Sequence, residues 1–306
     1  MRSFVAVLLA GVALVGCGAN RPKPVSASKQ GLPGEVVEAD GHEVHFECRG
    51  TGSPTVMFLN GHPEEAYNWD SVWGKSATLT RSCEYDRYGM GLTAVYGRMA
   101  EKARDAHDQE RELDQLLKNG EIPGPYVFVG HSWGGALGRL YAGTHDDVKG
   151  IVFVDSVVPG QEAALSAAVP PKRAGESSLV TERRDYRNGN PLDDLENLDW
   201  GKSLVEAGTV SSLGDRPDIV ITAGRSWYGV LSFEKPVRTR LQNELAALST
   251  DSVHVLAPTS SHFVQLDAPD VVLASIRAVV NVVRDNRRLA SCTAIFGHVP
   301  GAKCVR

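Results

Sequence analysis

The sequence lacks an excess of positive charge, and this narrows the classes of function open to it. Its 32 lysines and arginines are outnumbered by 37 aspartates and glutamates, which gives a formal net charge of -5. No cluster of basic residues with interleaved aromatic residues is present, so nothing in the sequence would attract the phosphate backbone of a nucleic acid. We therefore expect no nucleic-acid partner.

The chain also lacks the sequence patterns of metal and cofactor sites. Its cysteines, histidines and aspartates do not have metal-ligand spacing, and there is no glycine-rich loop of the kind that cradles phosphate groups. We therefore expect neither a metal nor a cofactor. The 306 residues, 42% hydrophobic and 23% charged, have the composition of an ordinary globular protein with one large core.

A short hydrophobic run lies at the N-terminus. Residues 4–15 are apolar, follow Arg2 and lead to Gly16 and Cys17. The run is shorter than the ~20 residues that cross a membrane, and its basic start is typical of a secretory signal. Leu-Val-Gly-Cys at residues 14–17 resembles the lipobox of bacterial lipoproteins, which implies cleavage before Cys17 and a diacylglyceryl group on that cysteine. A plain signal peptide or membrane anchor with a chance cysteine is the alternative.

Four segments are expected along the chain. Residues 1–16 form the signal peptide, and residues 17–34 contain proline, serine and lysine and almost no large apolar residues, which is typical of a solvated tether. Residues 35–290 form the main domain, and residues 291–306 form a C-terminal tail. We therefore expect an exported protein, held at the cell membrane or envelope by its N-terminal lipid.

Four further cysteines are available for disulfide bonds in an exported protein. Four cysteines allow three pairings. Cys292 and Cys304 lie close together in a tail that contains glycine and proline, so a local disulfide between them is the simplest assignment. That assignment leaves Cys48 with Cys83. Buried free thiols are the alternative.

Short apolar runs alternate with segments of helical character. Residues 36–47 alternate between polar and apolar around an Asp-Gly turn, which is the pattern of an antiparallel hairpin. Short, largely apolar runs, typical of strands buried on both faces, occupy residues 55–59, 126–129, 151–154 and 219–222, and two further strands are expected at residues 83–85 and 253–256. Helices are expected over residues 99–118, from after Gly135 to about 142, over 235–248 and over 269–284. The alternation predicts an α/β fold, with a mostly parallel sheet covered by helices on both faces.

One segment of the main domain lacks this order. Residues 160–215 are rich in charged residues, proline and asparagine, with only weak helical periodicity. The segment is too long for a simple loop in a compact domain. We interpret it as an inserted lid.

A nucleophilic serine is indicated at Ser132. Gly-His-Ser-Trp-Gly at residues 130–134 fits the pattern Gly-x-Ser-x-Gly, and it lies between an expected strand and an expected helix. Serine becomes a nucleophile only when a base takes its proton. His262 is the candidate base, because it lies between the last expected strand and the last helix of the domain, at the same edge of the sheet as Ser132.

These features together resemble the α/β-hydrolase family, over roughly residues 36–284. Asn-Gly-His-Pro at residues 60–63 resembles the His-Gly-x-Pro turn of that family, although Asn60 replaces the usual histidine. Tyr-Asp-Arg-Tyr-Gly-Met-Gly at residues 85–91 resembles its Asp-Arg-x-Gly-x-Gly stretch, and Ser-His-Phe at residues 261–263 its terminal Gly-His-Phe. The resemblance implies an eight-stranded, mostly parallel sheet.

The resemblance also implies an oxyanion hole and a disulfide. In the family, the backbone N–H after the nucleophile and one in the turn after the third strand bind the oxyanion, and here these belong to Trp133 and His62. Pro63 has no N–H and cannot serve. The family's strand order places the second, antiparallel strand beside the fourth, so Cys48 and Cys83 are implied to be neighbours and disulfide-bonded.

The third member of the triad is Asp155 by resemblance. The usual position, after the seventh strand, reads Thr-Ala-Gly-Arg-Ser at residues 222–226 and has no carboxylate. The family's second position, after the sixth strand, is occupied by Asp155, which would orient the His262 imidazole. A capping aspartate at a strand end is the alternative. Four other aspartates are weaker candidates: Asp193, Asp194, Asp199 and Asp218.

The function predicted from this set is hydrolysis of a small-molecule ester or lipid through an acyl-enzyme on Ser132. An amidase or aminopeptidase, or a carbon–carbon bond hydrolase, is the alternative within the same fold, and a non-catalytic lipid-anchored binding protein is the alternative outside enzymes. Epoxide hydrolysis and dehalogenation are disfavoured, because relatives with those activities carry aspartate where this chain has Ser132. The sequence gives no indication of the oligomeric state.

Overall fold

The computed structural model describes residues 25–26, 33–96, 102–185, 196–225 and 232–305. The predicted signal peptide, Cys17, most of the tether, Asp193 and Asp194 lie outside the described residues. Within those residues, no helix combines the length and the apolar character that a membrane crossing requires.

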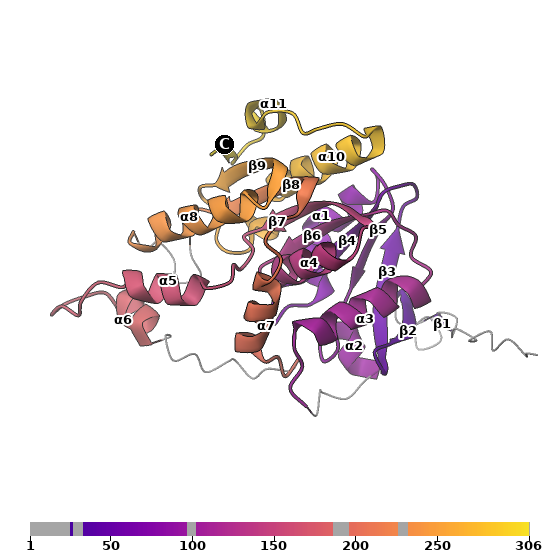
Figure 1. Cartoon of the computed structure of the whole chain (residues 1–306), viewed down its shortest axis with the longest axis horizontal. Coiled ribbons are helices and arrows are strands. Elements are labelled where there is room, and N and C mark those ends of the chain that lie inside the picture. Colours follow the sequence, from indigo (N-terminus) through magenta and orange to yellow (C-terminus); the bar gives the residue numbers. More distant parts are fainter. Residues whose placement is uncertain (1–24, 27–32, 97–101, 186–195, 226–231, 306) are drawn as a thin grey trace, which may run out of the picture.

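One mixed sheet runs through the centre of the described chain (Figure 1). Its strands are β1 (Val25–Ser26), β2 (Glu35–Ala39), β3 (His42–Arg49), β4 (Thr55–Leu59), β5 (Ser82–Tyr85), β6 (Tyr126–His131), β7 (Val148–Val154), β8 (Gly214–Ala223), β9 (Ser249–Ala257) and β10 (Lys303–Cys304). Their order across the sheet is β1-β2-β3-β5-β4-β6-β7-β8-β9-β10. Strands β4 to β9 are parallel to one another, whereas β1, β2, β3 and β10 pair antiparallel with their neighbours. The expected mostly parallel sheet is confirmed.

The sheet has two more strands than the eight predicted, and both are two residues long. Strand β1 pairs with β2 through Val25 and Val36, so part of the predicted tether belongs to the sheet. Strand β10 pairs with β9 through Cys304 and Val255, inside the predicted tail. Two residues have no periodicity to read, and each strand exists only because the neighbouring edge offers unpaired backbone groups.

Helices cover both faces of the sheet (Figure 1). They are the 3₁₀ turn η2 (Ala66–Trp69) and helices α1 (Asp70–Ser76), α2 (Gly91–Tyr96), α3 (Ala106–Asn119), α4 (Trp133–Thr144), α5 (Gln161–Ala168), α6 (Ser178–Asp185), α7 (Trp200–Gly208), α8 (Glu234–Ala246), α9 (Val264–Asp267), α10 (Pro269–Asp285) and α11 (Cys292–Phe296). Helix α3 begins later than the predicted residue 99, because Asp105 and Asp108 form a capping box there. Helix α10 begins at the predicted Pro269, in the first turn where proline is favoured.

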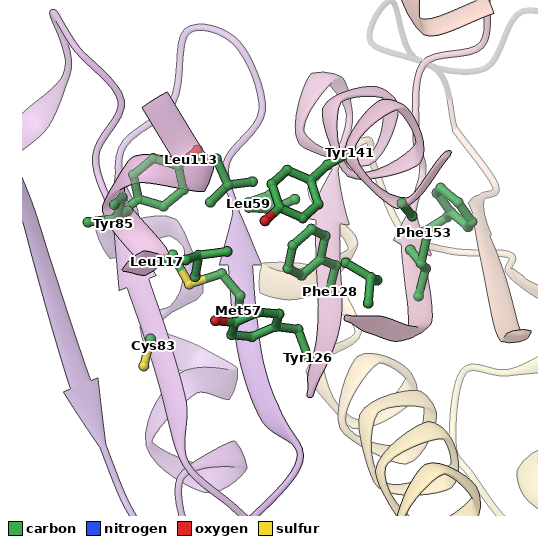
Figure 2. Close-up of a cluster of buried hydrophobic side chains, with 14 of the residues drawn as sticks. Met57, Leu59, Cys83, Tyr85, Leu113, Leu117, Tyr126, Phe128, Tyr141 and Phe153 are labelled. Carbon is green, nitrogen blue, oxygen red and sulfur yellow. The ribbon is translucent and has the colours of Figure 1, made fainter. Parts of the chain in front are cut away.

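The apolar runs in the central strands serve two separate cores. In β4, Val56 and Phe58 pack with α1, α10 and α11, whereas Met57 and Leu59 pack with α3, α4 and α8. Figure 2 shows the second core, where Met57 and Leu59 of β4 lie beside Leu113 and Leu117 of α3. A strand with helices on both faces needs apolar residues at every position, which explains the continuous runs in the sequence.

The predicted insertion lies between β7 and β8, and its described residues form three helices, α5, α6 and α7. Helices α5 and α6 lie together at one end of the molecule (Figure 1). The weak periodicity of the insertion did not reveal these helices, because they are short and bury few residues. Helix α6 buries only Arg183. Helix α7 is capped by Asp199 and buries Ser203 and Ala207. Strand β8 begins at Gly214, one residue before the predicted end of the insertion.

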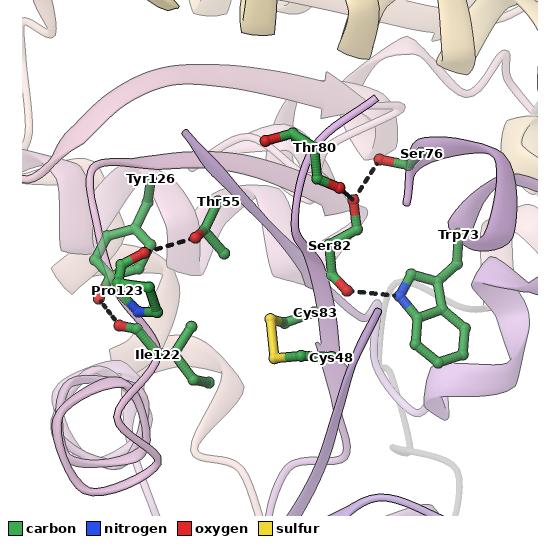
Figure 3. The surroundings of a disulfide bond; sticks show 10 residues. All are labelled: Cys48, Thr55, Trp73, Ser76, Thr80, Ser82, Cys83, Ile122, Pro123 and Tyr126. Carbon is green, nitrogen blue, oxygen red and sulfur yellow. Dashed lines mark hydrogen bonds between the residues drawn. A yellow bond between two sulfur atoms is a disulfide. The ribbon is translucent and has the colours of Figure 1, made fainter. Parts of the chain in front are cut away.

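Both predicted disulfides are present. Cys48 of β3 and Cys83 of β5 are direct cross-strand partners, as the resemblance implied. Figure 3 shows this disulfide beside the hydrogen bond from the Trp73 indole to the backbone oxygen of Ser82, 3.0 Å long. The second disulfide joins Cys292 and Cys304 and holds the tail against β9.

Removal of the first disulfide tests its contribution to stability. We expect the double variant Cys48→Ala/Cys83→Ala to lose on the order of 2–4 kcal/mol of unfolding free energy, because the bond closes a loop of 35 residues in the unfolded chain. Cys292→Ala/Cys304→Ala is the matched comparison and should lose less, since it closes only 12 residues. Urea unfolding of both variants measures the difference. An equal or larger loss from the second pair contradicts this account.

Candidate active site

Ser132 occupies a strained turn at the edge of the sheet. It lies between the end of β6 and the start of α4 and has φ 49° and ψ -117°. A positive φ is costly for any residue other than glycine, and such strain persists where the surrounding structure holds it. Here the Ser132 amide donates to the oxygen of Val154 (3.1 Å), and its carbonyl accepts from the amide of Val157 (3.1 Å). The turn thus places the serine directly beside the end of β7.

Two glycines of the motif are required by close approach of the backbone. A Cβ atom on Gly134 would lie 2.1 Å from the carbonyl oxygen of Leu59 at the end of β4. A Cβ atom on Gly130 would lie 2.6 Å from the backbone of Gly134. Helix α4 therefore starts against the sheet only because both side chains are missing.

Asp155 follows β7 and is bonded to the predicted base. Its Oδ2 atom lies 2.7 Å from Nδ1 of His262, and its Oδ1 accepts from the amide of Ala223 at 2.9 Å. Arg238 of α8 donates to both carboxylate oxygens at 2.8 Å. Burial alone would raise the pKa of this carboxyl, but Arg238 and His262 outweigh it and lower the pKa to about 2. Asp155 is thus a charged acceptor at neutral pH.

His262 lies in the loop between β9 and α9, as predicted. The Asp155 carboxylate can only accept a hydrogen bond, so Nδ1 carries the ring proton and Nε2 is the basic nitrogen. Burial lowers the pKa of His262, and the nearby charge of His131 lowers it further, whereas Asp155 acts in the opposite direction. The imidazole is therefore held in the neutral form that a general base needs.

A second buried ion pair, His131 with Glu64, contacts the backbone of His262, and the sequence reasoning missed it. Nδ1 of His131 lies 2.8 Å from Oε2 of Glu64, and its Nε2 lies 2.9 Å from the carbonyl oxygen of His262. Oε2 of Glu64 also accepts from the amide of Gly61 at 3.0 Å. Both nitrogens of His131 face acceptors, so both carry protons and the ring is an imidazolium. Burial lowers the pKa of His131, but Glu64 outweighs it and raises the pKa.

Titration of His262 tests the influence of this pair. We expect His131→Asn to raise the pKa of His262, because it removes a positive charge whose ring centre lies 4.5 Å from that of His262 and leaves the Asp155 carboxylate in place. NMR titration of the His262 ring proton, assigned with His262→Gln, measures the shift. His107→Asn, at an exposed position on α3, is the control and should leave the pKa of His262 unchanged. An unchanged or lower pKa of His262 in His131→Asn contradicts the assignment.

The turn proposed to bind the oxyanion is held by side chains from several elements. Asn60, which replaces the usual histidine, donates from Nδ2 to the oxygen of Tyr85 and accepts from the Trp69 indole, both at 2.8 Å. Asn60 therefore keeps the turn attached to β5 and η2. The His62 ring nitrogen Nδ1 lies 2.8 Å from Oε1 of Glu196, a residue of the insertion.

Trp133 is the first residue of α4, where backbone N–H groups have no partner within the helix and the helix dipole is positive. Its indole donates to Oε1 of Gln109 at 2.7 Å. Trp200, the first residue of α7, lies between the two predicted oxyanion residues, with ring centres 5.2 Å from Trp133 and 5.4 Å from His62. The insertion thus contributes an aromatic ring directly at the site.

The structure separates Asp155 from the weaker acid candidates that it describes. Asp199 caps α7 by accepting from the amide of Lys202 at 3.0 Å. Asp218 is buried in β8, where burial raises the pKa of its carboxyl well above the ordinary range. Neither is bonded to His262, in contrast to Asp155.

One trio of residues in the described chain has ligand atoms close enough for a metal ion, namely Glu64, His131 and His262, whose atoms lie within 4.8 Å of one another. Each already has hydrogen-bond partners within the protein. A metal would have to displace these partners and the proton that His131 shares with Glu64. The geometry favours an internal ion pair over a ligand set.

The fold and the site together define a class of protein: a mostly parallel sheet with a strained serine turn after one strand and a histidine–aspartate pair at the same edge. The sequence matches the alpha/beta hydrolase family over residues 56–275, and the chain belongs to this family.

Individual relatives lie within the same family. The chain is 27% identical over 287 residues to a haloalkane dehalogenase of Sphingobium indicum, covering 82% of this chain and 96% of the relative. It is 30% identical over 283 residues to a haloalkane dehalogenase of Mycolicibacterium smegmatis, with coverage of 78% and 87%.

Solved structures show the same fold. A loop variant of the haloalkane dehalogenase DbeA from Bradyrhizobium elkanii superposes with a TM-score of 0.62 at 16% identity, covering 82% of this chain and 97% of that one. A thermophilic esterase from Thermogutta terrifontis gives a TM-score of 0.58 at 18% identity, with coverage of 86% and 99%.

Sequence reasoning missed the charged residues around the predicted Ser132, His262 and Asp155 site. His131 stands inside the serine motif and Glu64 follows the Asn-Gly-His-Pro turn, so both could have been found by asking what fills the space beside His262. Arg87 was part of a recognised stretch without an assigned role. Glu196 and Arg238 lie in segments that carry no motif, and only the folded chain brings them to the site.

Proposed function

We propose that the protein hydrolyses carboxylic esters through an acyl-enzyme on Ser132. The observation that carries the proposal is the strained Ser132 turn at the same edge of the sheet as a histidine whose Nδ1 is bonded to Asp155. In the first step Oγ of Ser132 attacks the ester carbonyl, its proton passes to Nε2 of His262, and the alcohol leaves with that proton. Water then attacks the acyl group with His262 as base and releases the acid.

The serine favours acyl transfer over dehalogenation. A serine oxygen that displaced a halide from an alkyl carbon would form an ether, which the water in this site could not cleave. Attack on an ester carbonyl instead forms a new ester on Ser132, which water can hydrolyse. The names of the relatives therefore describe the family and not the proposed reaction.

The same acyl-enzyme chemistry serves the two alternatives within the fold, amide hydrolysis and carbon–carbon bond hydrolysis. We propose esters as the substrate because an alcohol leaving group needs less protonation by His262 than an amine or a carbanion does. A binding protein without turnover would have no use for a charged Asp155 bonded to a neutral His262 beside a strained serine.

Hydrolysis of p-nitrophenyl esters by the soluble domain tests the proposal. We expect Ser132→Ala and His262→Ala to lower kcat by at least about a thousandfold and Asp155→Asn by on the order of 10³–10⁴. Asp199→Asn is the matched control and should retain activity, since that residue only caps α7. Short and long acyl chains then give the first measure of substrate preference.

Parallel assays separate the alternatives. Faster release of p-nitroaniline than of p-nitrophenol would favour an amidase, and halide release from a 1-bromoalkane would overturn the serine mechanism. Absence of ester turnover in the native chain, together with no labelling of Ser132 by a fluorophosphonate, would favour the non-catalytic binding protein over the enzyme.

We also propose that the chain is exported and anchored to a membrane by a lipid on Cys17. The short apolar run, the Leu-Val-Gly-Cys sequence and the polar segment after it support this. The mass of the mature N-terminus, isolated from bacterial membranes, should correspond to a diacylglyceryl-modified Cys17. Cys17→Ser should release the protein from the membrane fraction, and an unmodified N-terminus at another residue would contradict the proposal.

A further inference from the structure

We propose that Glu196 of the insertion is a positioning residue for the oxyanion hole, so that the insertion influences the catalytic rate. This inference rests on the proposed ester hydrolysis and adds a residue to it. Glu196 is fully buried, and its carboxylate contacts three side chains that lead to the two predicted oxyanion donors, His62 and Trp133.

The first path runs through Arg87. Nε of Arg87 donates to Oε2 of Glu196 at 2.6 Å, and NH2 donates to Oε1 at 2.8 Å. The same guanidinium donates to the carbonyl oxygens of Asn60 at 2.6 Å and Gly61 at 2.5 Å. Glu196 therefore fixes the plane of the Arg87 guanidinium, and in this plane Arg87 donates to both the Asn60 and the Gly61 carbonyl oxygens.

The hydrogen bond from Arg87 to the Gly61 carbonyl orients the His62 N–H, which is proposed to bind the oxyanion. The carbonyl of Gly61 and the N–H of His62 belong to one peptide group, and that peptide is trans. In a trans peptide the oxygen and the amide hydrogen point in opposite directions. With the oxygen fixed on Arg87, the N–H of His62 must point to the other side of the turn.

The second path reaches Trp133. Nε2 of Gln109 donates to Oε2 of Glu196 at 2.9 Å, and Oε1 of Gln109 accepts from the Trp133 indole at 2.7 Å. The amide orientation is fixed, because a carboxylate only accepts and an indole N–H only donates. Oε1 of Glu196 also faces Nδ1 of His62. One carboxylate thus connects the side chains of both residues whose amides are assigned to the oxyanion.

The charge of Glu196 is maintained by its partners. Burial would raise the pKa of its carboxyl, but Arg87 outweighs this and lowers the pKa to about 2. Four donors converge on the two oxygens, two from Arg87 and one each from Gln109 and His62. A neutral amide at this position would present an N–H group to one of these donors, so the arrangement requires a carboxylate.

Thionoesters give a readout that a purely structural role would not change. Attack on a thionoester places the developing charge on sulfur, which is larger than oxygen and a weaker hydrogen-bond acceptor, so an intact oxyanion hole favours the ester. We expect Glu196→Gln to lower kcat for a p-nitrophenyl ester by about 10–100-fold, less than full loss of one donor. The ester-to-thionoester ratio of kcat/KM should fall with it, and KM should change little.

Glu234→Gln is the matched control. Glu234 is also buried and accepts from Arg183 of the insertion at 2.8 Å, but it does not contact the turn at residues 60–62. We expect the Glu234→Gln variant to keep the native ester-to-thionoester ratio, even if its melting temperature falls as much as that of the Glu196→Gln variant. Arg87→Met should reproduce the lowered ratio, because it removes the hydrogen bonds from Arg87 to the turn.

The outcomes separate this inference from the proposed function. If Ser132-dependent ester turnover is present in the native chain but Glu196→Gln keeps the native ratio, Glu196 is structural only and the inference is wrong. A fall in ratio of equal size in Glu234→Gln would also overturn it. If the native chain has no ester turnover, the proposed function itself fails, and the two failures are distinguishable.

Discussion

Pairing of buried carboxylates with cations at the carboxyl edge of the sheet is the interaction on which the site depends. Asp155, Glu64 and Glu196 are each buried, and each is held ionised by a cation: Arg238, His131 and Arg87. An unpaired charge in such a position would be costly, whereas a charge that is paired and hydrogen-bonded fixes the geometry of its neighbours. The three pairs hold, in turn, the base, the loop that carries the base, and the turn that is proposed to stabilise the oxyanion. Removing one partner would release more than one bond.

The electrostatic arrangement around His262 balances two opposing influences. The carboxylate of Asp155 favours a protonated ring, while burial and the imidazolium of His131 favour a neutral one. Arg238 shares the charge of Asp155, which limits how strongly that carboxylate can raise the pKa of the base. The result is a histidine that is oriented by an anion and is still unprotonated at Nε2 at neutral pH. The proposed acyl transfer requires such a base.

The parts of the site differ in how far the sequence could predict them. Ser132 and His262 were predictable, because parallel strands end at one edge and a motif or a residue placed after a strand must lie there. Asp155 could be inferred only from resemblance, since an aspartate at a strand end has several uses. Glu196 could not be inferred at all: its segment has weak periodicity, and its role depends on contacts with residues more than 80 positions away.

The sequence by itself determined the class of fold, the serine turn, the position of the predicted base and the Cys292–Cys304 pair, because apolar periodicity and short-range turn chemistry are local properties. The Cys48–Cys83 pair followed only from the strand order that the family resemblance implied. Tertiary structure decided the edge strands, the helices of the insertion and the partners of each buried charge. Those features arise from burial, which brings distant segments together and makes an unpaired ionic group too costly to keep. The serine motif therefore predicts the proposed nucleophile, and tertiary packing decides which buried charges surround it.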